Sequence, residues 1–178
     1  NWQHLFPPFR PAFDPLGPIL PEVASRTGLA ADCQVYTGIH DANSAYSLYL
    51  RGHRRPFSLV STGTWMVMFS PRLELSKLNP DRDTMALTNL LGQSLASARF
   101  MGGREFEMLT SGIADKEFAE ADLARVIDQR SFVLPSHAEG GGPFMGRKGS
   151  LVGPVLKEPG KILARATLYC ALMTATSM

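Results

Sequence analysis

Residues 37–45, TGIHDANSA, join two stretches of different character. Residues 34–38, which overlap the beginning of this stretch, favour a short buried strand that ends at a glycine. The residues after them, 42–50, are rich in Ala, Ser and Leu, which predicts a helix that ends near Gly52. The order is therefore strand, polar turn, helix, and Asp41 stands where the turn becomes the helix.

Asp41 has two interpretations that the residues alone leave open. An aspartate at the start of a helix is commonly an N-cap, whose carboxylate accepts hydrogen bonds from free backbone N–H groups. The same carboxylate at a domain cleft could act as a general base and take a proton from an alcohol. Gly38, Ala42 and Ser44 are small enough to let a substrate approach, but they suit tight helix packing equally well.

A second informative stretch is STGTW, residues 61–65. The apolar runs 57–61 and 65–69 flank Thr62-Gly63-Thr64, which predicts a β-hairpin with a glycine in its turn. Backbone N–H groups and hydroxyls in such a turn can bind a phosphate, although an ordinary hairpin needs no ligand. The turn matches neither a Walker A loop nor a Rossmann fingerprint.

Gly102 and Gly103 precede a predicted helix over residues 104–110. The start of a helix can receive an anion, and the two glycines would let a flat ring lie against the backbone. A tight entry into the helix explains the same glycines without a ligand.

For the rest of the chain we expect an irregular segment (5–21), a helical turn with a Gly28 C-cap (22–27), a surface excursion (71–83), the start of a strand (87–89), an amphipathic helix (116–129), a strand (132–135), a glycine-rich loop (139–143) and a buried helix (160–178).

Composition limits the class of protein. Of the 178 residues, 44% are hydrophobic and 19% are charged, which is typical of a globular protein with a core. The net charge is only +2 and the basic residues are scattered, so we expect no nucleic-acid partner. The longest apolar segment is interrupted by Arg165 and is too short to cross a membrane. Cys33 and Cys170 each lie in an apolar stretch, which suggests buried reduced thiols and a cytoplasmic location.

These motifs together resemble the FGGY carbohydrate kinases over nearly the whole chain. The resemblance rests on TGIHDANSA, on STGTW about 20 residues later, and on Met101-Gly102-Gly103 at the head of a helix. The His-Asp pair, the Ser-x-Gly-Thr-Trp form and Thr88-Asn89 with Gly92 are similar to the rhamnulokinase and fuculokinase branches. The strand 132–135 and the loop 140–143 match a later Pro/Gly-rich segment of the family.

The resemblance implies an α/β protein with the actin-like (ribonuclease H-like) kinase fold. Residues 1–52 would be the C-terminal end of the first domain, and residues 53–178 the first part of the second, with the boundary near Gly52 to Pro56. The sequence has no start methionine or signal pattern, and the family's N-terminal phosphate loop and later Gly-rich segment are missing from it. We therefore expect an internal fragment that spans the junction of the two domains and has little kinase activity alone.

The resemblance also implies the site. Asp41 matches the catalytic aspartate that deprotonates the sugar hydroxyl, and His40 accompanies it in binding the substrate. Gly63 and Thr64 match residues that hold the phosphates of ATP, Gly103 matches a glycine near the ribose and base, and Glu107 stands close to the adenine position. The reaction would use ATP with Mg²⁺ and no metal ligand from this chain. The partner would be a small sugar, a ketose or deoxyketose of the rhamnulose, fuculose or xylulose type, and a homodimer is an option.

Two other functions fit the residues less well. A non-catalytic sugar or nucleotide sensor could use the same fold, but it would need no general base. A metal-dependent hydrolase could use His40, Asp41, His137 and Glu139 as ligands, although their spacing matches no recognised zinc pattern.

Overall fold

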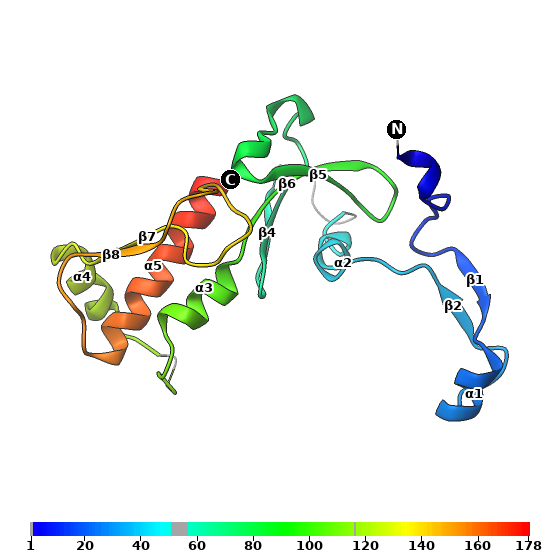
Figure 1. Cartoon of the computed structure of the whole chain (residues 1–178), viewed down its shortest axis with the longest axis horizontal. Coiled ribbons are helices and arrows are strands. Elements are labelled where there is room, and N and C mark those ends of the chain that lie inside the picture. Colours follow the sequence, from blue (N-terminus) through cyan, green and yellow to red (C-terminus); the bar gives the residue numbers. More distant parts are fainter. Residues whose placement is uncertain (1, 51–56, 116) are drawn as a thin grey trace. The chain divides into compact units, whose positions relative to one another are not determined.

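A computed structural model describes residues 2–50, 57–115 and 117–178. The chain divides into two compact units (Figure 1). Unit 1 is Asn1–Gly52 with Thr88–Ser94, and unit 2 is His53–Leu87 with Leu95–Met178. The expected domain boundary near residues 52–56 lies outside the described residues and stays a prediction. Each unit is described by itself.

Unit 1 is built from short elements. They are a 3₁₀ turn (η1, Gln3–Leu5), two strands (β1, Pro15–Pro18, and β2, Gln34–Tyr36) and two helices (α1, Pro21–Thr27, and α2, Asp41–Ser47). Strands β1 and β2 pair in antiparallel orientation, with an irregular register between Pro15 and Gly17. Helix α1 ends as expected at Gly28, whose φ of 75° is left-handed and whose N–H donates to the carbonyl of Ala24 at 2.9 Å.

Three expectations for unit 1 are wrong in detail. Residues 15–18 form a strand where an irregular segment was expected, because their prolines remain compatible with an edge strand. All three residues of β2 are exposed rather than buried, since the sheet has only two strands. The described helix α2 ends at Ser47, with Leu48 as its C-cap, and not near Gly52.

Unit 2 contains a four-stranded sheet in the order β3-β4-β6-β5, whose strands are Leu59–Ser61, Met66–Ser70, Ser94–Phe100 and Thr84–Thr88. Strands β3 and β4 form the expected hairpin, with Ser61 opposite Val67. Strand β4 pairs in turn with β6. Two 3₁₀ turns, η2 (Leu75–Lys77) and η3 (Pro80–Arg82), occupy the expected surface excursion.

Strand β6 was not predicted. Four consecutive residues of it, 95–98, are buried, so the strand shows no alternation of apolar and polar residues. Its central residues are small (Ala96, Ser97 and Ala98), which gives little β-propensity signal. A strand in the middle of a sheet and covered on both sides escapes a search for period-two patterns.

Three helices and a small second sheet complete unit 2. The helices are α3 (Gly102–Leu109), α4 (Glu120–Asp128) and α5 (Pro159–Ser177), and the sheet pairs β7 (Phe132–Leu134) with β8 (Ser150–Val152). Helix α5 packs against both α3 and α4 (Figure 1). The main core joins the sheet to α5 through Met68, Ala98, Phe100, Val133, Tyr169 and Met173.

Several expectations for unit 2 need correction. Strand β8 was not predicted, and within the described residues α4 begins only at Glu120 instead of Lys116. Helix α5 is not buried on most sides, because Thr167, Ala171 and Leu172 are exposed and Leu172 keeps 55% of its surface. Cys170, like Cys33 in unit 1, is only partly buried, although both are free thiols as expected.

Candidate functional site

Asp41 is the first residue of α2, and His40 is its N-cap. The Oδ1 atom of Asp41 accepts a hydrogen bond from the N–H of Ala42 at 2.7 Å and lies 2.9 Å from Nδ1 of His40. The Ala42 N–H also lies 3.3 Å from His40 Nδ1. Nδ1 thus accepts from Ala42 as a neutral imidazole nitrogen, whereas its contact with Asp41 becomes an ion pair only when the imidazole is protonated.

The carboxylate of Asp41 is open to solvent. Its side chain is 93% exposed and that of His40 is 71% exposed. Oδ1 is occupied by the Ala42 N–H and by His40, whereas Oδ2 has no hydrogen bond within the described residues. The pair therefore presents one carboxylate oxygen to an incoming group. This geometry combines the two interpretations of Asp41, since the carboxylate binds a helix N–H and still remains accessible.

A pocket of unit 1 adjoins this pair in sequence. It is lined by residues 9–13, by Gly38 and Ile39, and by residues 88–92. The last segment is attached to α2, because Asn43 donates from Nδ2 to the carbonyl of Thr88 at 2.6 Å. Gly38 and Ile39 lead directly into His40 and Asp41, so the pocket and the exposed carboxylate share one loop.

In unit 2 the structure brings Gly63, Thr64 and Gly103 together. The turn residues Thr62, Gly63 and Thr64 are exposed between β3 and β4. The N–H of Arg104 donates to the carbonyl oxygen of Thr64 at 3.4 Å. A Cβ atom on Gly103 would overlap the carbonyl oxygen of Gly63 and lie 3.1 Å from the Cα of Thr64. Only glycine allows α3 to begin this close to the turn.

The start of α3 has no side-chain cap at Met101, although the Arg104 N–H of its first turn already donates to the Thr64 carbonyl. The positive end of the helix dipole still favours a negatively charged group near this end. Gly102 is required by packing, because a Cβ there would lie 2.8 Å from the Phe100 ring. Glu107 is exposed one turn beyond Gly103 and therefore lies on the same face of the helix.

The sequence analysis missed Glu105, which is 2% exposed. Its Oε1 accepts hydrogen bonds from the N–H groups of His137 at 2.7 Å and Ala138 at 2.9 Å. Its Oε2 accepts from the hydroxyl of Tyr169 at 2.7 Å. Acidic residues in the first turn of a helix are usually exposed, so no pattern marked Glu105 as buried. The carboxylate fixes α3 to α5 and to the loop after β7.

Burial and the Glu105 carboxylate change the acidity of two neighbours. Burial, with a smaller contribution from Glu105, raises the pKa of Tyr169 far above its usual value. The same two causes, in the same order, raise the pKa of the Cys170 thiol to about 11. Both groups therefore stay protonated at neutral pH, and Tyr169 remains a donor to Glu105.

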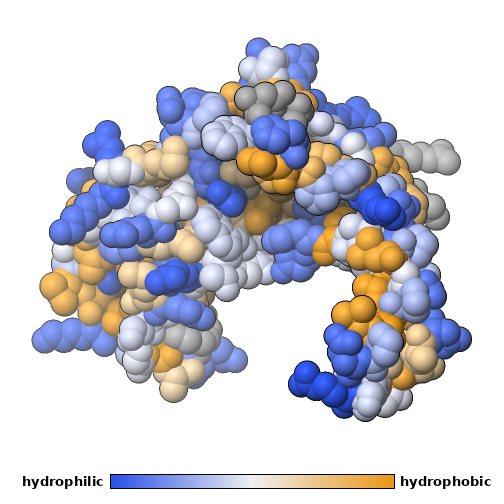
Figure 2. Space-filling view, turned by 45° about the vertical axis from the view of Figure 1, so that its right-hand side comes forward, coloured by the Kyte–Doolittle hydropathy of each residue, from blue (hydrophilic) through white to orange (hydrophobic). Residues whose placement is uncertain are grey.

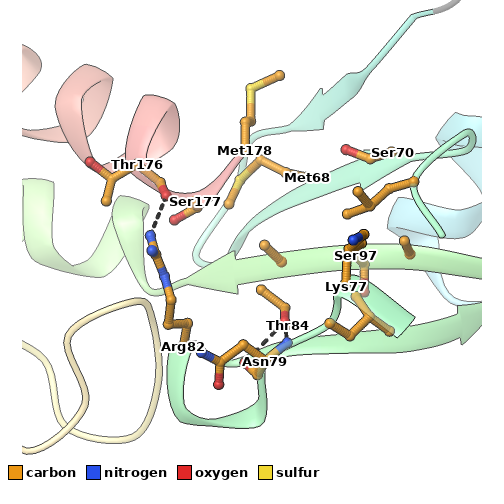
Figure 3. A pocket seen from close by; sticks show the side chains of 14 residues that line it. Met68, Ser70, Lys77, Asn79, Arg82, Thr84, Ser97, Thr176, Ser177 and Met178 are labelled. Carbon is orange, nitrogen blue, oxygen red and sulfur yellow. Dashed lines mark hydrogen bonds between the residues drawn. The ribbon is translucent and has the colours of Figure 1, made fainter. Parts of the chain in front are cut away.

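The pocket in Figure 3 contains none of the predicted site residues. It lies in unit 2, between β4, β6, the surface excursion and the end of α5. Arg82 donates from Nη2 to the carbonyl of Thr176 at 2.6 Å across it.

Within the described residues, no three His, Cys, Asp or Glu side chains lie close enough to hold a metal ion. Nor does any described helix combine the length and hydropathy needed to cross a membrane.

Solved structures similar to this one are sugar kinases. A carbohydrate kinase from Novosphingobium aromaticivorans is 33% identical, with a TM-score of 0.70 over 99% of this chain and 40% of that protein. A xylulose kinase from Rhodospirillum rubrum is 22% identical, with a TM-score of 0.53 over 91% of this chain and 34% of that protein. A xylulose kinase from Lactobacillus acidophilus is 14% identical, with a TM-score of 0.62 over 96% of this chain and 36% of that protein. The last two similarities concern the fold alone.

The fold is therefore of the carbohydrate kinase class. The family described as "Carbohydrate kinase FGGY, C-terminal domain" matches residues 54–178, and the chain belongs to the FGGY carbohydrate kinases. This confirms the resemblance seen in the motifs and the α/β, actin-like (ribonuclease H-like) fold that it implied for this region. No curated protein sequence matches the chain. The chain spans 40% of the Novosphingobium protein.

Proposed function

We propose that this chain is part of an enzyme that transfers the γ-phosphoryl group of ATP to a sugar hydroxyl. The observation that carries the proposal is the contact of Gly103 with Gly63 and Thr64. It joins an exposed hydroxyl-bearing turn to an uncapped helix start, and both kinds of group bind phosphate. Because the chain spans less than half of its structural relatives, we propose the activity for a longer polypeptide that contains it.

Asp41 is the general base in this proposal. Its free Oδ2 takes the proton of the sugar hydroxyl, while the hydroxyl oxygen bonds to the γ-phosphorus and the bond from that phosphorus to the β–γ bridging oxygen breaks to release ADP. His40 orients the carboxylate through the 2.9 Å contact between Nδ1 and Oδ1 and contributes to sugar binding. The small residues around Asp41 leave space for the substrate.

Gly63 and Thr64 bind the phosphates of ATP, Gly103 passes close to the ribose and base, and Glu107 contacts the adenine side. The described residues of the turn 62–64 and of the start of α3 fit a nucleotide better than a bare metal ion. They offer N–H groups and hydroxyls but no cluster of acidic ligands. Mg²⁺, when bound to the phosphates of ATP, would neutralise their charge during transfer.

The proposal extends to substrate, location and organisation. The substrate class is a ketose or deoxyketose of the rhamnulose, fuculose or xylulose type, and the enzyme acts in the cytoplasm, with a homodimer as an option. Residues 1–52 end the first kinase domain and residues 53–178 begin the second. The residues proposed to bind the sugar and the nucleotide then come from different domains.

The test is ATP-dependent phosphorylation of a panel of ketoses and L-sugars by the longer polypeptide. We expect one sugar class to react and Asp41→Asn to lower kcat by roughly 10² to 10⁴ while ATP binding is retained. Asp32→Asn is the matched control, because Asp32 is an exposed aspartate of the same unit. If no sugar reacts, the sensor interpretation replaces the kinase proposal. If a sugar reacts but Asp41→Asn behaves like the control, Asp41 is a helix cap and not the general base.

A further inference from the structure

Arg99 of β6 makes two charged contacts beside the proposed phosphate turn. Its guanidinium carbon lies 4.7 Å from the centre of the Trp65 ring, within the range of a cation–π interaction. Its Nε lies 3.1 Å from Oδ2 of Asp83. The side chain of Asp83 is 10% exposed and that of Arg99 is 41% exposed. The stacked arginine is therefore held in one orientation by a nearly buried carboxylate.

The same carboxylate oxygen holds the glycine-rich loop. Asp83 Oδ2 accepts a hydrogen bond from the N–H of Gly142 at 3.1 Å. A Cβ atom on Gly141 would lie 2.7 Å from Asp83 Oδ2 and 3.1 Å from the Trp65 ring. The loop thus passes directly between the carboxylate and the indole, where no side chain fits. Gly141 and Gly142 also have φ values of 152° and 101°, which other residues rarely adopt.

Asp83 is placed for this role by the end of the surface excursion. Its φ is 53°, a left-handed conformation that is uncommon for a residue other than glycine. Its N–H donates to the carbonyl of Pro80 at 3.0 Å, which closes the 3₁₀ turn η3. A non-glycine residue in this conformation persists only where its surroundings hold it. Here its partners are Arg99 and Gly142.

Trp65 connects these contacts to the phosphate turn. Trp65 directly follows Thr64, whose carbonyl is bound by Arg104 of α3. We propose that Asp83 and Arg99 are positioning residues. They fix Trp65 and, through it, the turn at Thr64, and they make the Gly140–Gly142 loop part of the same proposed nucleotide site. This inference rests on the proposed function, because it concerns the site proposed to bind ATP.

A positioning role differs from a stabilising one in its consequences. Loss of Arg99 leaves the nearly buried Asp83 carboxylate without its charged partner, so this loss will also lower stability. Displacing a binding group by about 1 Å, in contrast, can lower a rate by roughly a hundredfold. A positioning role is therefore recognised by a loss of nucleotide use that sugar binding does not share, and not by stability.

The experiment compares Arg99→Met, Arg99→Lys and Asp83→Asn in the longer polypeptide. Arg125→Met is the control, since Arg125 is an exposed arginine of α4 in the same unit. We expect Arg99→Met and Asp83→Asn to raise KM for Mg·ATP by about tenfold or more, with KM for the sugar within about twofold of the parent value. Arg99→Lys keeps the charge but loses the Nε hydrogen bond and the planar stacking, so an intermediate value is expected.

A second readout does not depend on turnover. The chain has two tryptophans, Trp2 and Trp65, so Trp2→Phe in the 178-residue chain leaves Trp65 as the only tryptophan reporter. We expect Mg·ATP to change its emission, and the Arg99 and Asp83 variants to require about tenfold more nucleotide.

Each outcome decides the inference. A selective rise in KM for Mg·ATP, with KM for the sugar close to the parent value, supports it. Variants that match Arg125→Met overturn it, and so does a parallel loss of sugar affinity and thermal stability, which would indicate a structural role only. If the parent protein neither phosphorylates a sugar nor responds to Mg·ATP, the proposed function is wrong and this inference fails with it. If the parent is active and the Arg99 and Asp83 variants behave like Arg125→Met, the proposed function stands and the positioning inference is wrong.

Discussion

The two units differ in how far they bury their own side chains. Unit 2 buries Phe69, Phe100, Met68 and Leu163 almost completely. Unit 1 buries Ala24, Ala42 and Tyr46, but leaves Phe9 98% exposed. Other large apolar side chains of unit 1 are also exposed: Trp2, Leu5, Phe6, Phe13 and Leu16. Figure 2 shows hydrophobic residues, coloured orange, at the surface among hydrophilic ones.

This difference in burial distinguishes the proposed nucleotide-binding residues, which belong to unit 2, from the proposed catalytic pair, which belongs to unit 1. Gly63, Thr64 and Gly103 belong to a unit with a continuous core, which holds them in place before any ligand binds. Asp41 and His40 belong to a unit of short elements with few buried residues. We infer that the nucleotide half is preorganised within this chain, whereas the catalytic half needs packing partners beyond the contacts described here.

Hydrogen exchange tests this contrast most directly and has the largest expected effect. Amides of β4 and β6 should exchange with the global opening of unit 2, because these strands lie in the middle of its sheet. Amides of α2 should exchange about a thousandfold faster, since a helix of seven residues is marginal unless it is well packed and α2 buries only Ala42, Asn43 and Tyr46. Measurement on the 178-residue chain, residue by residue, gives the ratio. Equal protection of α2 and β4 would show that unit 1 is as stable as unit 2, and the contrast would be wrong.

Much of the fold was accessible from the sequence because it depends on local signals. The hairpin over 57–69 and the C-cap at Gly28 follow from turn residues and apolar runs. The helix expected over 104–110 is α3, although it begins two residues earlier, at Gly102. Strand β6 was missed because its burial on both faces removes the alternation of residues. Glu105 and the Asp83–Arg99 pair were missed because their partners are far away in sequence. Their partners emerge only when the chain is folded.

The second prediction concerns Glu105, whose hydrogen bonds tie three segments of unit 2 together. Glu105→Leu would leave the N–H groups of His137 and Ala138 and the Tyr169 hydroxyl without their acceptor. We expect the free energy of unfolding of unit 2 to fall by about 3 kcal/mol or more, because buried groups that lose a charged partner are costly.

Two matched variants sharpen that result. Glu105→Gln keeps an acceptor oxygen and should cost less than Glu105→Leu, by about 1 kcal/mol or more. Glu107→Gln changes an exposed residue of the same helix and should stay within about 0.5 kcal/mol of the parent. Urea denaturation followed by circular dichroism measures all three. Similar losses for Glu105→Leu and Glu107→Gln would mean that the buried carboxylate does not organise unit 2.

The third and smallest effect compares two glycines that meet at the proposed nucleotide site. Gly103→Ala would place its Cβ against the carbonyl of Gly63, so α3 or the turn must shift, at a cost of about 1–3 kcal/mol in the free energy of unfolding. Gly63→Ala should cost less than about 1 kcal/mol, because its nearest atom would be the Trp65 carbonyl oxygen at an ordinary 3.6 Å. Urea midpoints of the two variants give the comparison. Since the substitutions are chemically identical and the sites adjoin, only the close approach of helix and turn distinguishes them, and equal costs would show that this contact is not tight in solution.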